Sequence, residues 1–307
     1  MKNIVFVTDA ESLPIDCDMD PLVTACADFD LSIEIRKWDD PTVNWAAFDL
    51  VVLRSPWSYT RRLQEFLGWC RKVSNVTRLE NPLAVIEWSL DKHYLSDLAD
   101  ANVPIVPTLF IEPNAARVAG TLADFKRQQQ NCSEVVVKPS VGAYSKDVQR
   151  FKTDKKADIL GYIEKLNRRG DSVLVQPYLS SIDLVGETDL IFFNGQYSHA
   201  IRKGALLAAD GTVNVPTSDF RQEREPDETE ITVASKALKV AADKFGLRRP
   251  LLYARVDLVK DIKGDPVVLE MEAAEPSLSL PNCRGSATRF AYALNEMCRE
   301  DELASVS

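Results

Sequence analysis

The chain has 307 residues, of which 45% are hydrophobic, and its formal net charge is −9. This length is typical of two or three lobes that share an interface. The negative charge excludes a nucleic-acid coat, which needs a basic face, whereas a nucleotide site needs only local cations. No apolar run approaches the roughly 20 residues that span a bilayer, and the N-terminus does not resemble a signal peptide. Six scattered cysteines without a CxxC pair indicate a reduced, cytoplasmic protein that is not bound to a membrane.

The first 80 or so residues alternate between apolar strands and amphipathic helices. The expected elements are a strand at 3–9, a helix at 21–29, strands at 31–38 and 50–55, and a helix at 60–73. This βαβ rhythm predicts a small parallel sheet with helices on it. No GxGxxG follows a strand, so dinucleotide binding is not supported. Ligands still bind at the carboxyl ends of such strands, where Arg54, Ser55 and Trp57 are placed.

Two lysines in the middle of the chain are candidates for binding an anion. Lys92 follows Asp91, the expected N-cap of a helix, where the macrodipole disfavours a cation unless an anionic partner is near. Lys138 ends the apolar strand 134–138. The small-residue loop Ser140–Lys146, which includes Ser145, follows it and could direct backbone N–H groups at phosphate oxygens. The alternative for both lysines is an ordinary surface position.

The strand at 172–176 breaks at Pro177 and leaves a free edge. Gln176 and Leu179 flank the break, so their backbone could hydrogen-bond an adenine between apolar walls. Asp183 lies four residues after Leu179 and could accept hydrogen bonds from the ribose hydroxyls. An ordinary exit from strand to loop would have the same sequence.

An Asn-Gly pair at 194–195 predicts the clearest hairpin in the chain. It joins strands at 188–193 and 196–202 and suits a type I′ turn. Arg202 and Lys203 close the second strand on opposite faces. Further helices are expected near 122–130, 154–166, 225–245 and 285–299.

The segment Tyr253–Pro276 predicts a second hairpin, with its turn at 262–265. Alternation along its second strand places Val267, Leu269 and Met271 on one face and Glu270 and Glu272 on the other.

Three carboxylates would crowd the polar face of this hairpin. Asp257 is expected nearly opposite Glu270, with Glu272 and Arg255 beside them. Like charges in this arrangement are destabilising unless something positive lies between them, and Mg²⁺ favours oxygen ligands and phosphates. An arginine beside such a cluster can hold carboxylate or phosphoryl oxygens. The alternative is a solvated hairpin face.

Five separated elements, in this order and spacing, resemble the ATP-grasp ligases over roughly residues 85–280. They are Lys92, Lys138, the Ser140–Lys146 loop, the Gln176–Leu179 segment, and Asp257 with Glu270 and Glu272. The resemblance implies an α/β protein with an N-terminal Rossmann-like parallel-sheet domain at 1–84, a small central lobe at 85–178 and a C-terminal antiparallel-sheet lobe at 179–307. ARVD at 254–257 looks like the D-alanine–D-alanine ligase and glutathione synthetase branch.

The resemblance also implies roles for single residues. Those that would bind ATP are Lys92, Lys138 and Ser145 at the phosphates, Gln176 and Leu179 at the adenine, and Asp183 at the ribose. Those that would ligate two Mg²⁺ ions, or Mn²⁺ in their place, are Asp257, Glu270 and Glu272. Arg255 would steady acyl-phosphate oxygens, with Arg202 and Lys203 as further catalytic candidates. Arg54, Ser55 and Trp57 would line the pocket of a small amino-acid substrate.

A narrower resemblance covers nearly the whole chain. It rests on TDAES at 8–12, LRSPWSY at 53–59, LDKHYL at 90–95, GETDLIFFNGQYSHAIRK at 186–203 and EAAEPSLSL at 272–280. These motifs look like the D-cycloserine ligase (cyclising synthetase) group. The resemblance implies that ATP phosphorylates the carboxylate of O-ureido-D-serine. The aminooxy nitrogen then closes the ring of the antibiotic D-cycloserine, with loss of CO₂ and ammonia. A homodimer is a family expectation.

Two departures from the family pattern affect these expectations. Glu272 stands where the family usually has asparagine, and Glu275 is close enough in sequence to replace one metal ligand. The covering loop contains one glycine, Gly142, where many members have several. The alternatives that remain are an intermolecular amino-acid or dipeptide ligase, a non-catalytic nucleotide-binding regulatory module, and an α/β binding protein without a nucleotide.

Overall fold

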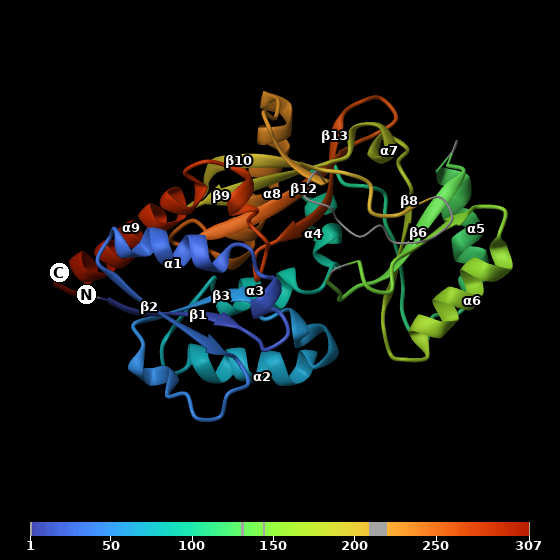
Figure 1. The fold of residues 1–307 in the computed structure, drawn as a ribbon. Helices are drawn as coiled ribbons and strands as arrows, with labels where there is room; N and C mark the ends of the chain where they lie inside the picture. The colour runs from blue at the N-terminus through green and yellow to red at the C-terminus, as the bar shows by residue number, and fades with distance from the viewer. Residues whose placement is uncertain (1, 130–131, 144, 209–219, 307) are drawn as a thin grey trace.

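Three β-sheets organise the chain, and each is built from one part of the sequence (Figure 1). The computed structural model describes residues 2–129, 132–143, 145–208 and 220–306. The sheets lie within the three predicted ranges, although the exact boundaries at 84 and 178 stay predictions. None of the helices in these described ranges is long and apolar enough to cross a membrane.

The N-terminal sheet is parallel, as predicted. Its strand order is β2 (Leu31–Lys37), β1 (Lys2–Thr8), β3 (Leu50–Ser55) and β4 (Arg78–Glu80). Helix α1 (Met19–Ala27) covers one face and α2 (Leu63–Ser74) covers the other, because side chains of β1 alternate between two apolar cores. Ile4 and Phe6 pack with α1, and Val5 and Val7 pack with α2.

The central sheet is antiparallel and small. Its order is β5 (Leu109–Ile111), β8 (Val173–Pro177), β6 (Glu134–Pro139) and β7 (Gln149–Lys152). Helices α5 (Val118–Gln128) and α6 (Lys156–Asn167) bury Phe125 and Ile163 against it. Because β6 and β8 are antiparallel, with Val136 opposite Gln176, the side chains of Lys138 and Gln176 lie on the same face of this sheet.

The C-terminal sheet is also antiparallel. Its order is β11 (Arg221–Arg224), β10 (Gln196–Lys203), β9 (Glu187–Phe193), β12 (Tyr253–Lys260) and β13 (Pro266–Glu272). The short helix α7 (Ser181–Val185) precedes β9. Helix α8 (Glu228–Phe245) packs on one face and begins with a capping box between Asp227 and Glu230. Helix α9 (Ser286–Val306) packs on the other face and runs beside α1, which joins this sheet to the N-terminal sheet (Figure 1).

The region around Lys92 differs from the predicted helix. The helix α4 (Tyr94–Asp100) begins later, and its N-cap is His93 without a side-chain cap, so the predicted role of Asp91 is wrong. The backbone N–H of Lys92 donates to Ser140 O at 3.0 Å, which ties this segment to the end of β6. Together with α3 (Leu83–Ser89), α4 packs on the C-terminal sheet, where the Met271 N–H donates to the Tyr94 hydroxyl at 2.8 Å.

A β-bulge changes the predicted faces of β13. Asp257 pairs with Glu270, as predicted, but the neighbouring Leu258 pairs with Val268. Leu269 is therefore an extra residue on β13. The expectation that Val267, Leu269 and Met271 share one face is wrong, because Met271 packs in the core beneath α8 with Val268 instead.

A buried histidine gives the fold an expected pH dependence. The His199 Nε2 lies 2.8 Å from Leu278 O, and burial lowers its pKa from 6.5 to about 4. The native state therefore takes up this proton less readily than the unfolded state, so the stability from neutral His199 is complete above pH 6.5 and is lost as pH falls toward 4. We expect His199→Gln to flatten the fall in unfolding free energy over this window by about 3 kcal/mol, measured by urea unfolding. Parallel pH profiles of the two proteins would contradict this.

Candidate active site

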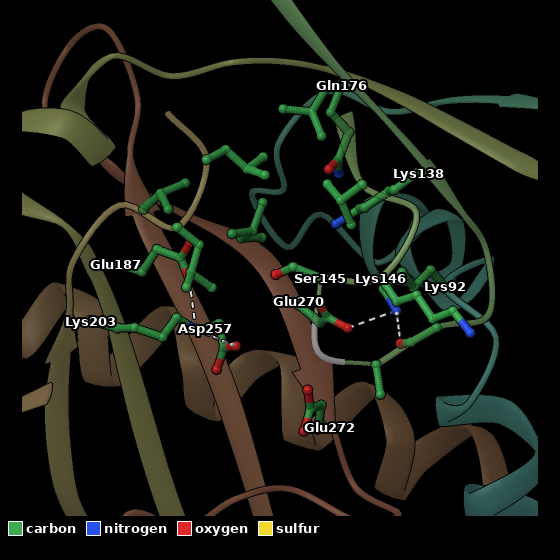
Figure 2. Close-up of a pocket in the computed structure, with 18 of the residues that line it drawn as sticks. Lys92, Lys138, Ser145, Lys146, Gln176, Glu187, Lys203, Asp257, Glu270 and Glu272 are labelled. Carbon is green, nitrogen blue, oxygen red and sulfur yellow. Dashed lines mark hydrogen bonds and ion pairs between the residues drawn. The ribbon is translucent and has the colours of Figure 1, made fainter. Parts of the chain in front are cut away.

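A cavity of about 300 Å³ lies where the three sheets meet. Its walls include Trp57 and Tyr59 from the N-terminal part, Lys138 from the central sheet, and Asp257 and Glu270 from the C-terminal sheet. In Figure 2, Lys92, Lys138 and Lys146 lie on one side of this cavity, whereas Glu187 and Asp257 lie on the other side together with Lys203. An arrangement with opposite charges and an apolar wall suits a large, mostly anionic ligand.

Both predicted phosphate lysines line the cavity and neither is a surface residue. The Lys92 Nζ lies 2.8 Å from Glu270 Oε1 and donates to Gly142 O at 3.2 Å (Figure 2). Burial alone would lower the pKa of Lys92, but Glu270 reverses the effect and raises it. Lys138 is 7% exposed, and its side chain forms no hydrogen bond or ion pair with a described residue; burial lowers its pKa, although Glu270 acts in the opposite direction. A buried cation without a counter-ion is costly, so Lys138 is suited to receive an anion.

The covering loop also reaches the cavity. Ser145 and Lys146 line it, and Ser145 has a positive φ of 52°. Tyr144 lies outside the described residues. The loop is therefore beside Lys92 and Lys138, as predicted, with its backbone turned sharply at Ser145.

The predicted adenine residues lie at the apolar end of the cavity. Gln176 and Leu179 line it, and Gln176 Nε2 donates to Thr108 Oγ1 at 2.9 Å. The apolar side chains around them are Val106, Val136, Ile182, Leu206, Leu207, Val259 and Leu269. Asp183 is not among the lining residues. Its carboxylate accepts hydrogen bonds from Arg150 at 3.2 and 3.3 Å and one from the Tyr178 hydroxyl.

The predicted acid patch is assembled around Arg255. The Arg255 Nε donates to Asp257 at 2.7 Å, and its Nη2 donates to Glu272 at 2.7 Å. Burial would raise the pKa of Asp257, but Arg255 and Lys203 together lower it to about 2. Glu272 has the opposite balance, because burial and the nearby Glu270 outweigh Arg255 and raise its pKa to about 8.

Sequence reasoning missed two acids on β9. Glu187 and Asp189 share a face of this strand, and Asp189 pairs directly with Asp257 of β12. Ligand oxygens of these three carboxylates lie within 4.8 Å of one another, which is close enough to hold a metal ion. The alternating Glu-Thr-Asp of residues 187–189 was the available signal.

The side chains of Arg202 and Lys203 lie on opposite faces of β10. The Lys203 Nζ enters the β9 acids, 2.7 Å from Glu187, 3.2 Å from Asp189 and 3.5 Å from Asp257. These carboxylates raise the pKa of Lys203 against the effect of burial. Arg202 lies on the other face, where its Nε donates to Val185 O at 2.6 Å, and it does not line the cavity.

Only Trp57 of the three predicted substrate residues lines the cavity. Arg54 is fully buried beneath it, with its guanidinium 5.4 Å from the Tyr253 ring and its Nη2 donating to Pro276 O at 3.1 Å. Ser55 shares a hydrogen bond with Thr8 across β3 and β1 at 2.8 Å. The structure therefore brings Trp57 to the cavity and leaves Arg54 and Ser55 behind its wall.

The residues present fit a nucleotide with divalent ions. The apolar end suits a flat ring, and the partnerless Lys138 with Lys92 and Lys146 suits phosphate oxygens. Carboxylates are the ligands that Mg²⁺ prefers, and here they come from the adjacent strands β9, β12 and β13.

Comparison with known proteins gives a consistent result. Residues 4–81 match the family model of the N-terminal domain of the D-cycloserine synthetase DcsG. The cycloserine biosynthesis protein DcsG of Streptomyces lavendulae is 48% identical over 296 residues, which is 96% of this chain and 99% of that protein.

Solved structures agree with the sequence comparison. A crystal structure of the D-cycloserine synthetase DcsG has a TM-score of 0.92 at 48% identity and covers 96% of this chain and 99% of its own. The ATP-grasp ligase PsnB, in a complex with Mg and ADP, has a TM-score of 0.60 at 16% identity and covers 96% and 98%. The second likeness concerns the fold alone. The first, with the 48% identity over nearly the whole length, shows that the chain belongs to the D-cycloserine synthetase family, and its fold is that of the ATP-grasp ligases.

Proposed function

We propose that this ligase uses ATP and Mg²⁺ to convert O-ureido-D-serine to D-cycloserine. In this reaction the substrate carboxylate becomes an acyl phosphate, and the aminooxy nitrogen attacks the acyl carbon and displaces phosphate. One water removes the carbamoyl group as CO₂ and ammonia. The observation that carries the proposal is the buried, partnerless Lys138 facing carboxylates across one cavity, in a chain 48% identical to a cycloserine biosynthesis protein.

The nucleotide would lie along the cavity with its phosphates at the lysines. Lys92, Lys138 and Ser145 would hold the phosphates, and Gln176 and Leu179 would hold the adenine. Asp183 would accept hydrogen bonds from the ribose hydroxyls after giving up its present hydrogen bonds from Arg150 and Tyr178. The apolar walls exclude water, which an acyl phosphate requires.

The metal ions would be held by Asp257, Glu270 and Glu272, and Glu187 and Asp189 extend this set. When bound, Mg²⁺ would neutralise the negative charge of the phosphoryl group during its transfer to the substrate carboxylate. Arg255 is held rigidly by two acids, so its guanidinium is already oriented toward the cavity. Lys203 brings a fixed positive charge to the same wall, and Arg202 takes no part.

A phosphate-release screen tests this function. Wild-type protein with ATP and Mg²⁺ is given O-ureido-D-serine, D-serine, D-alanine and their L-forms, each alone and with a second amine. We expect phosphate release with O-ureido-D-serine alone and a product with the mass of cycloserine. Release that needs two amino acids would favour the intermolecular ligase. Tight ATP binding with no release for any carboxylate would favour the regulatory module.

A further inference from the structure

The loop that follows β13 is fixed by the N-terminal part of the chain. The Trp57 Nε1 donates to Glu275 O at 2.9 Å, and the Arg54 Nη2 donates to Pro276 O at 3.1 Å. Asp18 accepts the backbone N–H groups of Leu278 at 2.6 Å and Leu280 at 2.7 Å. This loop is therefore held by three buried side chains from the N-terminal part of the chain, one on β3, one in the turn after it and one before α1.

Glu275 is the residue of this loop whose side chain lines the cavity beside the aromatic wall. Glu275 is 6% exposed and lines the cavity beside Trp57 and Tyr59. Glu270 and Glu272 each have a cation at 2.7–2.8 Å, but no described lysine or arginine forms an ion pair with Glu275. Burial raises the pKa of Glu275 and outweighs the Tyr59 hydroxyl and the charge of Lys92, which favour the ionised carboxylate. A buried carboxylate without an ion pair is costly.

We propose that Glu275 binds the α-ammonium group of the amino-acid substrate, with Trp57 and Tyr59 as the aromatic wall of this subsite. The inference rests on the proposed function and adds to it the side chain that binds the substrate's α-ammonium group. Arg54 is a positioning residue in this subsite, because it holds the loop through Pro276 and does not reach the cavity.

The surroundings favour an ammonium over a metal ion at Glu275. Mg²⁺ needs about six oxygen ligands in octahedral geometry. Beside it lie the indole of Trp57 and the phenol of Tyr59, whose polar groups are already engaged and which offer no further oxygen ligands, and Lys92 and Glu270 act on it electrostatically.

Two residues further along the chain, the same loop is contacted by arginines. The Arg255 Nη1 donates to Ser277 O at 3.0 Å, and the Arg221 Nη1 donates to Ser277 Oγ at 2.9 Å, and both arginines line the cavity. The loop thus lies between the Glu275 carboxylate and two arginines, of which Arg255 is already paired with Asp257 and Glu272. A molecule with an ammonium at one end and a carboxylate at the other matches that polarity.

The test compares wild type with Glu275→Gln on two substrates. One is O-ureido-D-serine, and the other is its analogue with hydrogen in place of the α-amino group. We expect kcat/KM for the amino acid to fall about 10- to 100-fold in the variant, mainly through KM, because a charge-assisted hydrogen bond is lost. The KM for ATP and the Mg²⁺ dependence stay at wild-type values. On the analogue the two proteins have the same kcat/KM.

Three results would overturn the inference. These are an unchanged KM for the amino acid, an equal loss on both substrates, or a shift in Mg²⁺ dependence, which would make Glu275 a metal ligand. If Glu275→Gln does not fold, wild type must still prefer the amino acid over the analogue at least tenfold in KM, and Tyr59→Phe must reduce that preference. Exposed Glu164→Gln is the matched control. If wild type releases no phosphate with O-ureido-D-serine, the proposed function itself has failed and the inference falls with it.

Discussion

Replacing Lys138 with alanine is expected to raise the dissociation constant for ATP by about 100-fold, because a charge-assisted bond to a phosphate in a water-poor cavity is lost. The same change should leave the melting temperature without nucleotide unchanged or higher. Lys138 is buried with no ion pair to a described residue, so its removal relieves a desolvated charge. Isothermal titration with Mg-ATP and thermal unfolding measure the two effects.

The matched control for this variant is Lys152→Ala. Lys152 is an exposed lysine at the end of β7 in the same sheet and does not line the cavity. We expect wild-type ATP affinity for it. Equal affinities of the Lys138 and Lys152 variants would show that Lys138 does not contact the nucleotide. A fall in the melting temperature of the nucleotide-free Lys138 variant would indicate that the lysine is structural.

Replacing Glu270 with alanine is expected to lower the rate of phosphate release by about three orders of magnitude, because the site loses the acid that neutralises Lys92 and that we propose as a metal ligand. The fold should persist, since Glu270 points into the cavity and the core side chains of β13, Val268 and Met271, stay in place. Phosphate release over a range of Mg²⁺ concentrations and circular dichroism check both expectations.

Glu270→Gln separates the two roles of this acid. The amide keeps the shape and can still accept a hydrogen bond from Lys92, but it is neutral and ligates Mg²⁺ poorly. We expect it to be nearly as inactive as alanine. Activity within tenfold of wild type in both variants would remove Glu270 from the metal site. Unfolding of both would make the acid a structural partner of Lys92.

The fold was largely predictable because most of its elements carry strong local periods. The parallel order of the first sheet, the Asn-Gly hairpin and the hairpin at 253–272 each follow from patterns within a few residues of one another. The packing of α3 and α4 on the C-terminal sheet was not predictable in this way. Both helices have only seven residues, which is too short for a clear hydrophobic periodicity, so tertiary contacts decide where they pack.

The site was predictable where one hairpin contains it. Asp257, Glu270 and Glu272 were found because they are opposite each other on adjacent strands. Glu187 and Asp189 were missed because their meeting with Asp257 requires the pairing of β9 with β12, more than 60 residues apart in sequence. Arg54 was placed at the correct strand end, but the docking of α9 and the Pro276 loop buries it behind the wall.

The single extra residue at Leu269 has a consequence for how this family can vary. Because Leu269 is unpaired, Glu270 and Glu272 face the cavity and Met271 faces the core, whereas the same residues paired without a bulge would place the acids and Met271 on the opposite sides. The exposed turn at 261–265 lies before the bulge, outside the paired residues, and can change length without moving the acids. Loss of Leu269 itself would restore regular pairing at this point, with Glu270 still opposite Asp257 and both acids still facing the cavity. Relatives are therefore expected to differ in length in the turn and to keep the two-residue spacing from position 270 to 272, which holds both acids on one face.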